Sequence, residues 1–157
     1  MTIHRNFAVI AVLAISGALM PSLHAQDPAK GALGKATSIK CTFPLMAAST
    51  LQTASPEAKI KPSNLTLEFD AINTDEGTAE MKAVVGKYDI VVRYASGYLH
   101  LIQSFLDGPL YTTTIIEKKT AGGKFKAMHS RHEYTDVALP GITSSPEQYY
   151  GECEVLK

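Results

Sequence analysis

The densest run of side chains capable of chemistry is His129-Ser130-Arg131-His132, near the end of an alternating segment. On a β-strand, successive side chains point to opposite faces, so His129 and Arg131 share the face of the apolar Phe125. If that face is the core, both polar side chains point into the domain. We therefore expect Arg131 and His129 to bind an anionic group, such as a carboxylate, at the mouth of a barrel.

The competing interpretation of the same pair is structural. A charged side chain that points into a core needs a partner or water, because burying an unpaired charge is costly. Arg131 would then pair with a carboxylate on the last strand, either Glu152 or Glu154, if that strand is adjacent. In that case the pair stabilises the fold and binds no ligand.

Other kinds of active site find less support. Ser130 and His132 share one strand face with Cα atoms about 6.5 Å apart, which leaves a hydrolase as a third hypothesis. However, no orienting acid can be assigned, and no nucleophile-elbow, phosphate-loop or dinucleotide motif occurs. On a strand, His129 and His132 point to opposite faces and cannot share a metal ion. The pattern favours a protein without catalytic residues, metal or cofactor.

The chain has two cysteines, Cys41 and Cys153, and an even pair in an exported protein is typical of a disulfide bond. The bond would close a loop of 112 residues. Loops of this size are expected to gain roughly 4–5 kcal/mol of stability from a cross-link. Neither cysteine is then available as a nucleophile.

The N-terminus predicts export. Arg5 precedes an apolar stretch over residues 7–20, and the small Ala25 suits a cleavage site, so residues 1–25 are interpreted as a secretory signal peptide. An uncleaved anchor is the alternative, but the stretch is shorter than the ~20 residues that span a bilayer. We expect a periplasmic or secreted protein with no stable membrane span. Residues 26–35 are expected to be a flexible leader, and residues 36–157 a single β domain.

The balance of charged residues limits the classes of partner that the protein could bind. Without Arg5, 14 basic residues face 15 acidic ones, and no basic cluster is present. This balance argues against nucleic acid as a partner. It leaves a small lipophilic molecule or another envelope protein.

The remaining sequence predicts strands. Apolar and polar residues alternate from residue 64 onward, and Gly-containing turns interrupt the alternation. The predicted strands cover residues 36–43, 65–71, 79–85, 88–94, 98–105, 110–118, 124–134 and 148–156. Two long loops are expected at 44–63 and 136–146, with two helical turns possible over 45–53.

The short connections require antiparallel pairing, because parallel strands need crossovers of a dozen residues or more. Eight strands in a meander predict an all-β, antiparallel up-and-down barrel, with a two-sheet sandwich as the alternative. If the first and last strands are neighbours, Cys41 and Cys153 meet at the seam.

Three segments carry a resemblance to known proteins. They are Thr-Thr-Thr-Ile at 112–115, Phe-x-Ala-Met-His-Ser-Arg-His at 125–132 and Gln-Tyr-Tyr-Gly-x-Cys at 148–153. In spacing, the pattern resembles a family of small exported bacterial proteins of unestablished function. The resemblance implies no activity, but it favours the periplasm or the exterior of a bacterium.

The leading functional hypothesis is a non-catalytic binding protein that holds a small apolar or amphipathic ligand inside the barrel, with Arg131 and His129 near its mouth. The alternative is an envelope factor or enzyme inhibitor that binds another protein through the loops at 44–63 and 136–146. A packed or a hollow interior separates these two hypotheses.

Overall fold

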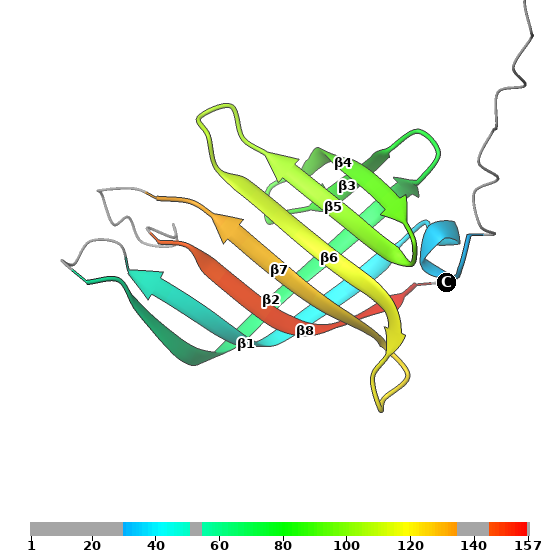
Figure 1. Ribbon diagram of the computed structural model, residues 1–157. Coiled ribbons are helices and arrows are strands. Elements are labelled where there is room, and N and C mark those ends of the chain that lie inside the picture. The colour runs from blue at the N-terminus through cyan, green and yellow to red at the C-terminus, as the bar shows by residue number, and fades with distance from the viewer. Residues whose placement is uncertain (1–29, 51–54, 135–144, 157) are drawn as a thin grey trace, which may run out of the picture.

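The computed structural model describes residues 30–50, 55–134 and 145–156, and these residues form one closed antiparallel barrel (Figure 1). Every strand pairs with its neighbours in the sequence, and the last strand pairs with the first. The strands are β1 (Ile39–Thr50), β2 (Glu57–Asn73), β3 (Thr78–Lys82), β4 (Lys87–Ala95), β5 (Tyr98–Ser104), β6 (Leu110–Lys119), β7 (Phe125–His132) and β8 (Glu147–Val155). The predicted up-and-down barrel is confirmed. The signal peptide predicted at 1–25 lies outside the described residues.

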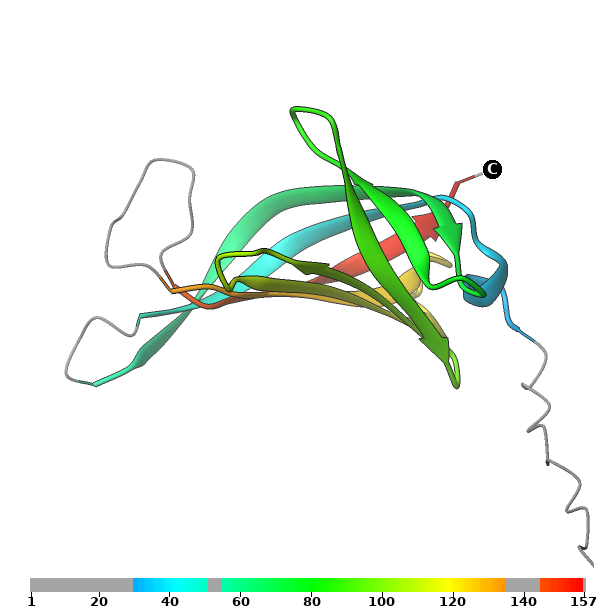
Figure 2. The ribbon, with the colours of Figure 1, turned by 90° about the horizontal axis from the view of Figure 1, so that it is seen from above.

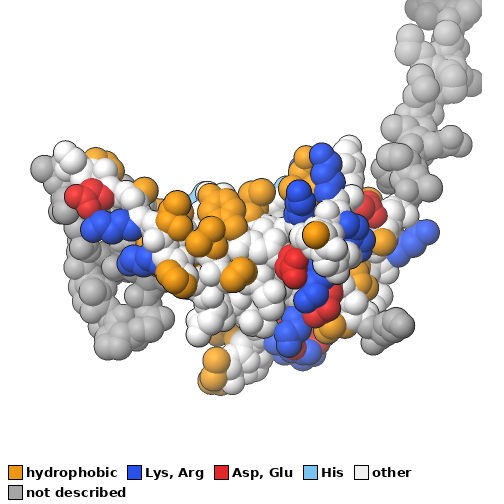
Figure 3. Space-filling model, turned by 90° about the horizontal axis from the view of Figure 1, so that it is seen from below, with side chains coloured by type: hydrophobic (Ala, Val, Ile, Leu, Met, Phe, Trp, Pro, Cys, Tyr) orange, Lys and Arg blue, Asp and Glu red, His pale blue; other side chains and the backbone are white. Residues whose placement is uncertain are grey.

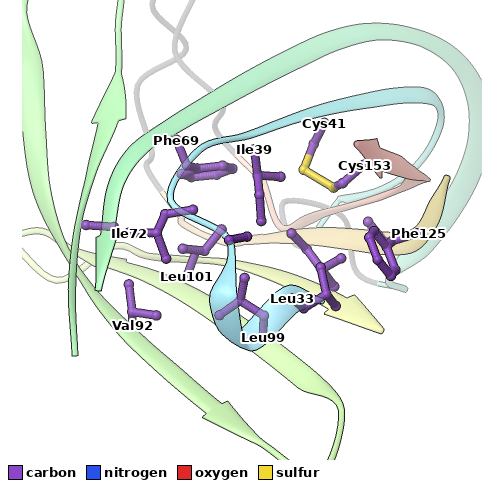
Figure 4. Packing of buried hydrophobic residues seen from close by; sticks show 14 of the residues in the cluster. Leu33, Ile39, Cys41, Phe69, Ile72, Val92, Leu99, Leu101, Phe125 and Cys153 are labelled. Atoms are coloured by element: carbon purple, nitrogen blue, oxygen red, sulfur yellow. A yellow bond between two sulfur atoms is a disulfide. The ribbon is translucent and has the colours of Figure 1, made fainter. Parts of the chain in front are cut away.

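Alternation along the strands produces the core. On β5, Leu99, Leu101 and Gln103 are buried while their neighbours are more exposed. The buried apolar side chains of all eight strands form one cluster inside the barrel, in which Ile39 and Phe125 lie next to the disulfide while Ile72 and Val92 lie farther away (Figure 4). Because strand side chains alternate between faces, the buried residues of a strand are mostly two positions apart, as Ile39, Cys41 and Phe43 are on β1.

The barrel has two different ends. At the end called the plug end, a short 3-10 helix, η1 (Leu33–Lys35), lies against the strands. Leu33 is completely buried among core residues (Figure 4), and its N–H donates to Glu117 Oε1 at 3.4 Å. Tyr94 also donates to Glu117, at 2.8 Å. Residues 30–35 are therefore part of the packed domain, which corrects the flexible leader predicted at 26–35; residues 26–29 are not described.

The opposite end, called the mouth end, carries the turns 83–86 and 105–109 and the ends of β1 and β7. Here β1 and β2 continue as a long hairpin, and residues 45–50 and 57–62 of this hairpin are called the arm (Figures 1 and 2). Over residues 45–50 and 57–62, the arm corrects the loop predicted at 44–63 and the helical turns predicted at 45–53; residues 51–54 are not described. Backbone pairing from Leu45↔Pro62 to Thr50↔Glu57 forms the arm, although its side chains are mostly exposed and show no strong hydrophobic alternation. Most of the loop predicted at 136–146 lies outside the described residues.

The wall is incomplete between β2 and β3. Their pairing covers only Phe69↔Met81, Asp70↔Glu80 and Asn73↔Thr78, because β3 ends at Lys82. The strand predicted at 79–85 is therefore too long at its end, and residues 83–86 form the turn to β4. Seen from above, the tip of the β3–β4 hairpin stands away from β2 (Figure 2).

The seam between β1 and β8 closes the barrel. Cys41 pairs with Cys153 across it, and the predicted disulfide bond joins the two fully buried residues. Next to the disulfide, the pairing shifts from Thr42↔Glu152 to Leu45↔Tyr150, so two residues of β1 lie opposite Gly151. The two residues form a bulge, where the missing N–H of proline is tolerated, and one of them is Pro44.

The close approach of β1 to β8 at this bulge requires glycine at position 151. A Cβ atom on Gly151 would lie 2.0 Å from the carbonyl oxygen of Thr42, which belongs to the backbone and cannot rotate away. We expect Gly151→Ala to lower the free energy of unfolding by about 1–3 kcal/mol. Gly122→Ala is the matched control, because its Cβ would meet nothing closer than 3.8 Å and the change should be neutral or slightly stabilising. Urea unfolding of both variants measures the difference, and equal stabilities would contradict this account of the seam.

Candidate functional site

The residues singled out in the sequence lie on β7 as the alternation predicts. His129 is buried, and Arg131 is half-buried on the same inner face, toward the mouth end. Ser130 and His132 lie on the outer face. The register places Tyr111 opposite Arg131 on β6, and Tyr149 opposite His129 on β8.

His129 is surrounded by rings and makes two hydrogen bonds. Its exposure is 3%, and the rings of Phe43, Tyr149 and Tyr111 lie 5.9, 5.7 and 6.1 Å from its own. Burial, and secondly the positive charge of Arg131, lower the pKa of His129 to about 3, so the imidazole is neutral at pH 7. Arg131 Nε can only donate, and it lies 3.4 Å from His129 Nε2. The proton of the imidazole is therefore on Nδ1, which donates to Thr113 Oγ1 at 2.8 Å.

Arg131 lies between two aromatic rings and beside a carboxylate. Its guanidinium carbon is 5.3 Å from the ring centre of Tyr111 and 5.2 Å from that of Tyr149, distances at which a cation is attracted to the ring face. Its Nη1 lies 4.0 Å from Glu147 Oε2. An arginine held in this way is oriented by the protein itself.

The carboxylate beside Arg131 differs from the predicted ones. Glu152 and Glu154 lie instead near Lys124, at 3.8 and 3.6 Å. The reason is the register of β7 with β8, in which Arg131 pairs with Glu147 while Glu152 pairs with Lys126. Arg131 does lie beside a carboxylate of the last strand, as the structural interpretation expects, but that carboxylate is Glu147.

Two tyrosines also donate to carboxylates, one of them the Glu147 that lies beside Arg131. Tyr149 Oη donates to Glu147, and Tyr111 Oη donates to Glu133. Burial, reinforced by these hydrogen bonds, raises the pKa of both phenols to about 12. We call Tyr111, Thr113, His129, Arg131, Glu147 and Tyr149 the mouth cluster. Its one cation is matched by Glu147, so it offers no surplus positive charge to an anion.

The residues that contact Arg131 were not predicted from the sequence, although the alternation of strand side chains indicates three of them. Tyr149 and Glu147 lie four and six positions before Cys153, so they share its inner face if the strand is regular. Tyr111 is related in the same way to Ile115. The parity of the strands could therefore have identified three members of the mouth cluster.

The outer face of β7 offers no assembled catalytic group. Ser130 and His132 line an open hollow of about 210 Å³ together with Ala47, Ala58 and Gln148. In the described part of the chain, no hydrogen bond joins Ser130 to His132, and no carboxylate orients His132. The hydrolase hypothesis therefore gains no support from this geometry.

Within residues 30–50, 55–134 and 145–156, no three His, Cys, Asp or Glu side chains lie close enough to hold a metal ion. Over the same ranges, no helix has the length and apolar character that crossing a bilayer demands.

Comparisons of the chain with models of protein families, with curated proteins and with solved structures found no match. The resemblance of residues 112–115, 125–132 and 148–153 to small exported bacterial proteins stays a prediction.

The burial of a neutral His129 makes stability depend on pH. The pKa is about 3 in the folded protein and ~6.5 when the chain unfolds, so the unfolded state binds more protons between these values and stability falls as the pH drops through this range. When the pH drops from 7 to 4.5, the free energy of unfolding should fall by about 2–3 kcal/mol less in His129→Gln than in the parent protein. Urea unfolding at a series of pH values measures this, with His100→Gln, on the outer face, as the control. The same pH dependence in parent and His129→Gln would show that His129 is not buried in its neutral form.

Proposed function

We propose that the protein is an exported, non-catalytic binding protein whose barrel is a rigid frame and whose mouth end contacts a partner protein. The disulfide between two fully buried cysteines supports an oxidising compartment outside the cytoplasm. The surface at the mouth end supports the binding role.

The observation that carries the proposal is the difference between the turns at the two ends. At the mouth end, Val84, Val85 and Leu106 are 104%, 85% and 110% exposed. At the plug end, the turns 74–77, 96–97 and 120–124 contain only small, polar or charged residues. Exposed apolar side chains gathered in one region indicate a contact surface. Apolar turns at one end alone therefore indicate that this end meets a partner.

The surface seen from below agrees with this difference. Apolar side chains gather next to the arm, while charged side chains of both signs crowd the plug end (Figure 3). Leu45 and Ile60 on the arm are 42% and 76% exposed, and Tyr150, opposite Leu45 on β8, is 43% exposed. Exposed apolar side chains thus lie both on the turns of the mouth end and on the outer face of the arm.

Packing inside the barrel supports protein binding over the enclosure of a ligand. Leu33, Ile39, Leu99 and Ile115 have no accessible surface at all. A side chain that lined a water-sized space would have accessible surface, so no water-sized space adjoins these four side chains. The plug half of the barrel is filled by its own side chains, which leaves the mouth half for binding.

One observation favours a second function, the binding of a small amphipathic molecule in the mouth half. Gln103 is 7% exposed, points inward opposite Tyr111, and its Oε1 has no hydrogen-bond partner among the described residues. A buried acceptor without a donor is costly. A ligand with a hydroxyl or amide N–H would satisfy this oxygen.

The proposed function predicts contacts at the mouth end in the living cell. A photo-crosslinking amino acid at position 106 should give discrete protein adducts in the native host, because Leu106 is fully exposed at the proposed surface. The same amino acid at position 121, in a plug-end turn, should give none. The triple variant Val84→Ser, Val85→Ser, Leu106→Ser should keep the parent's melting temperature, since these side chains pack against little. Adducts of equal yield from both positions, or from neither, would refute the proposal.

The second function predicts a bound molecule. Native mass spectrometry of the protein purified from its own host should then show the mass of a bound molecule. The Gln103→Leu variant should show no such mass, because it lacks the amide oxygen that accepts the hydrogen bond while its side-chain volume is nearly the same. Gln148→Leu, on β8 outside the mouth cluster, is the control that should retain it. A bare polypeptide mass in the parent protein would exclude a tightly held ligand and leave the partner protein as the function.

A further inference from the structure

The long strand β2 has a partner along only part of one side. On the side of β1 it is paired from Glu57 to Phe69. On the other side, β3 pairs with it only at Phe69, Asp70 and Asn73. Over residues 57–67, therefore, no strand among the described residues lies on that side of β2. We call this stretch the free edge.

Part of the free edge lacks the features that protect exposed strands. Natural edges are commonly protected by lysines and prolines. Lys59, Lys61 and Pro62 protect the outer part of the free edge in this way, but residues 63–67 read Ser-Asn-Leu-Thr-Leu and contain neither. In this inner part, the N–H of Leu65 is satisfied by a side chain, the hydroxyl of Ser63 at 3.2 Å. The unprotected stretch is thus short and adjoins the point where the β2–β3 pairing stops.

A hollow lies at that point. It has a volume of about 480 Å³, and its apolar lining is formed by Leu67 and Met81, with Ala83 and Val84 of the β3–β4 turn. Glu68 and Lys82 form its polar side, 3.2 Å apart. The hollow is large enough for an apolar side chain of a strand added beside residues 63–67.

Charges along the free edge favour one kind of strand. At the hollow, Lys82 neutralises both Glu68 and Asp70, at 3.2 and 2.9 Å. Farther along, Lys59 lies 3.3 Å from Glu57, while Lys61 has no carboxylate within ion-pair distance in the described part of the chain. Opposite charges facing each other across two strands are stabilising. The complementary strand therefore carries an acidic residue about six positions, or roughly 20 Å, from the residue that enters the hollow.

We propose that the free edge of β2 binds an extended segment of a partner protein by strand addition, with an apolar side chain in the hollow and an acidic side chain opposite Lys61. The free edge presents a row of backbone groups at strand spacing beside which no strand lies among the described residues, and another extended backbone matches that spacing. A small molecule or a lipid surface cannot satisfy such a row. This inference rests on the proposed function and names the part of the partner that is bound.

The experiment uses the mature disulfide-bonded protein and a phage-displayed library of random twelve-residue peptides. We expect enrichment of proline-poor peptides that combine an acidic residue with an apolar one. In hydrogen–deuterium exchange, these peptides should protect the amides of residues 63–67. Ala83→Arg, which fills the hollow, should weaken their binding at least tenfold, whereas Ala121→Arg in a plug-end turn should leave it unchanged. Lys61→Glu should weaken it several-fold.

Several results would overturn the inference. They are the absence of enriched peptides, protection confined to other strands, and equal binding by Ala83→Arg and the parent protein. Sedimentation of the protein alone tests a second copy as the occupant, and a dimer that protects residues 63–67 would replace the partner segment. Adducts from position 106 without protection of the free edge would reject strand addition while leaving the proposed function in place.

Discussion

The pairing of β1 with β8 holds the first and last strands together, and the Cys41–Cys153 disulfide lies inside it. Without this pairing the sheet would be open, and the inner faces of both strands would be exposed to water. A cross-link over 112 residues is worth roughly 4–5 kcal/mol, which is comparable to the whole stability of a small domain. The buried positions of Phe43, His129 and Tyr149 all depend on the seam, since their strands are β1, its partner β8 and the neighbouring β7.

The mouth cluster illustrates how a buried polar group becomes part of a scaffold. Arg131 has rings on two sides, a carboxylate beside it and a neutral histidine that accepts its Nε hydrogen. Each of these contacts reduces the cost of removing the charge from water. The cluster therefore orients its own members, and under the proposed function a partner would meet the turns and the free edge instead.

Much of the fold could be predicted from the sequence, because most inward residues from β4 to β7 are apolar and Gly-containing turns separate the strands. The inward direction of His129 and Arg131 followed from the same parity. The arm could not be predicted in this way: residues 57–62 are all exposed, so pairing leaves no hydrophobic pattern in them. The partner of Arg131 could not be predicted either, because it depends on the register between β7 and β8, and the sequence carries no clear signal for that register.

The 3-10 helix at the plug end has a consequence for the order of folding. Leu33 precedes every strand in the chain, yet its N–H bonds to Glu117 of β6 and its side chain packs in a core that β8 helps to enclose. Its binding place exists only after most of the later strands have assembled. Contacts between residues so distant in the chain make folding slow, because long loops must close before they form. A segment that precedes every strand in the chain is thus among the last to pack, and until then the apolar strands that it covers are open to chaperones and to aggregation.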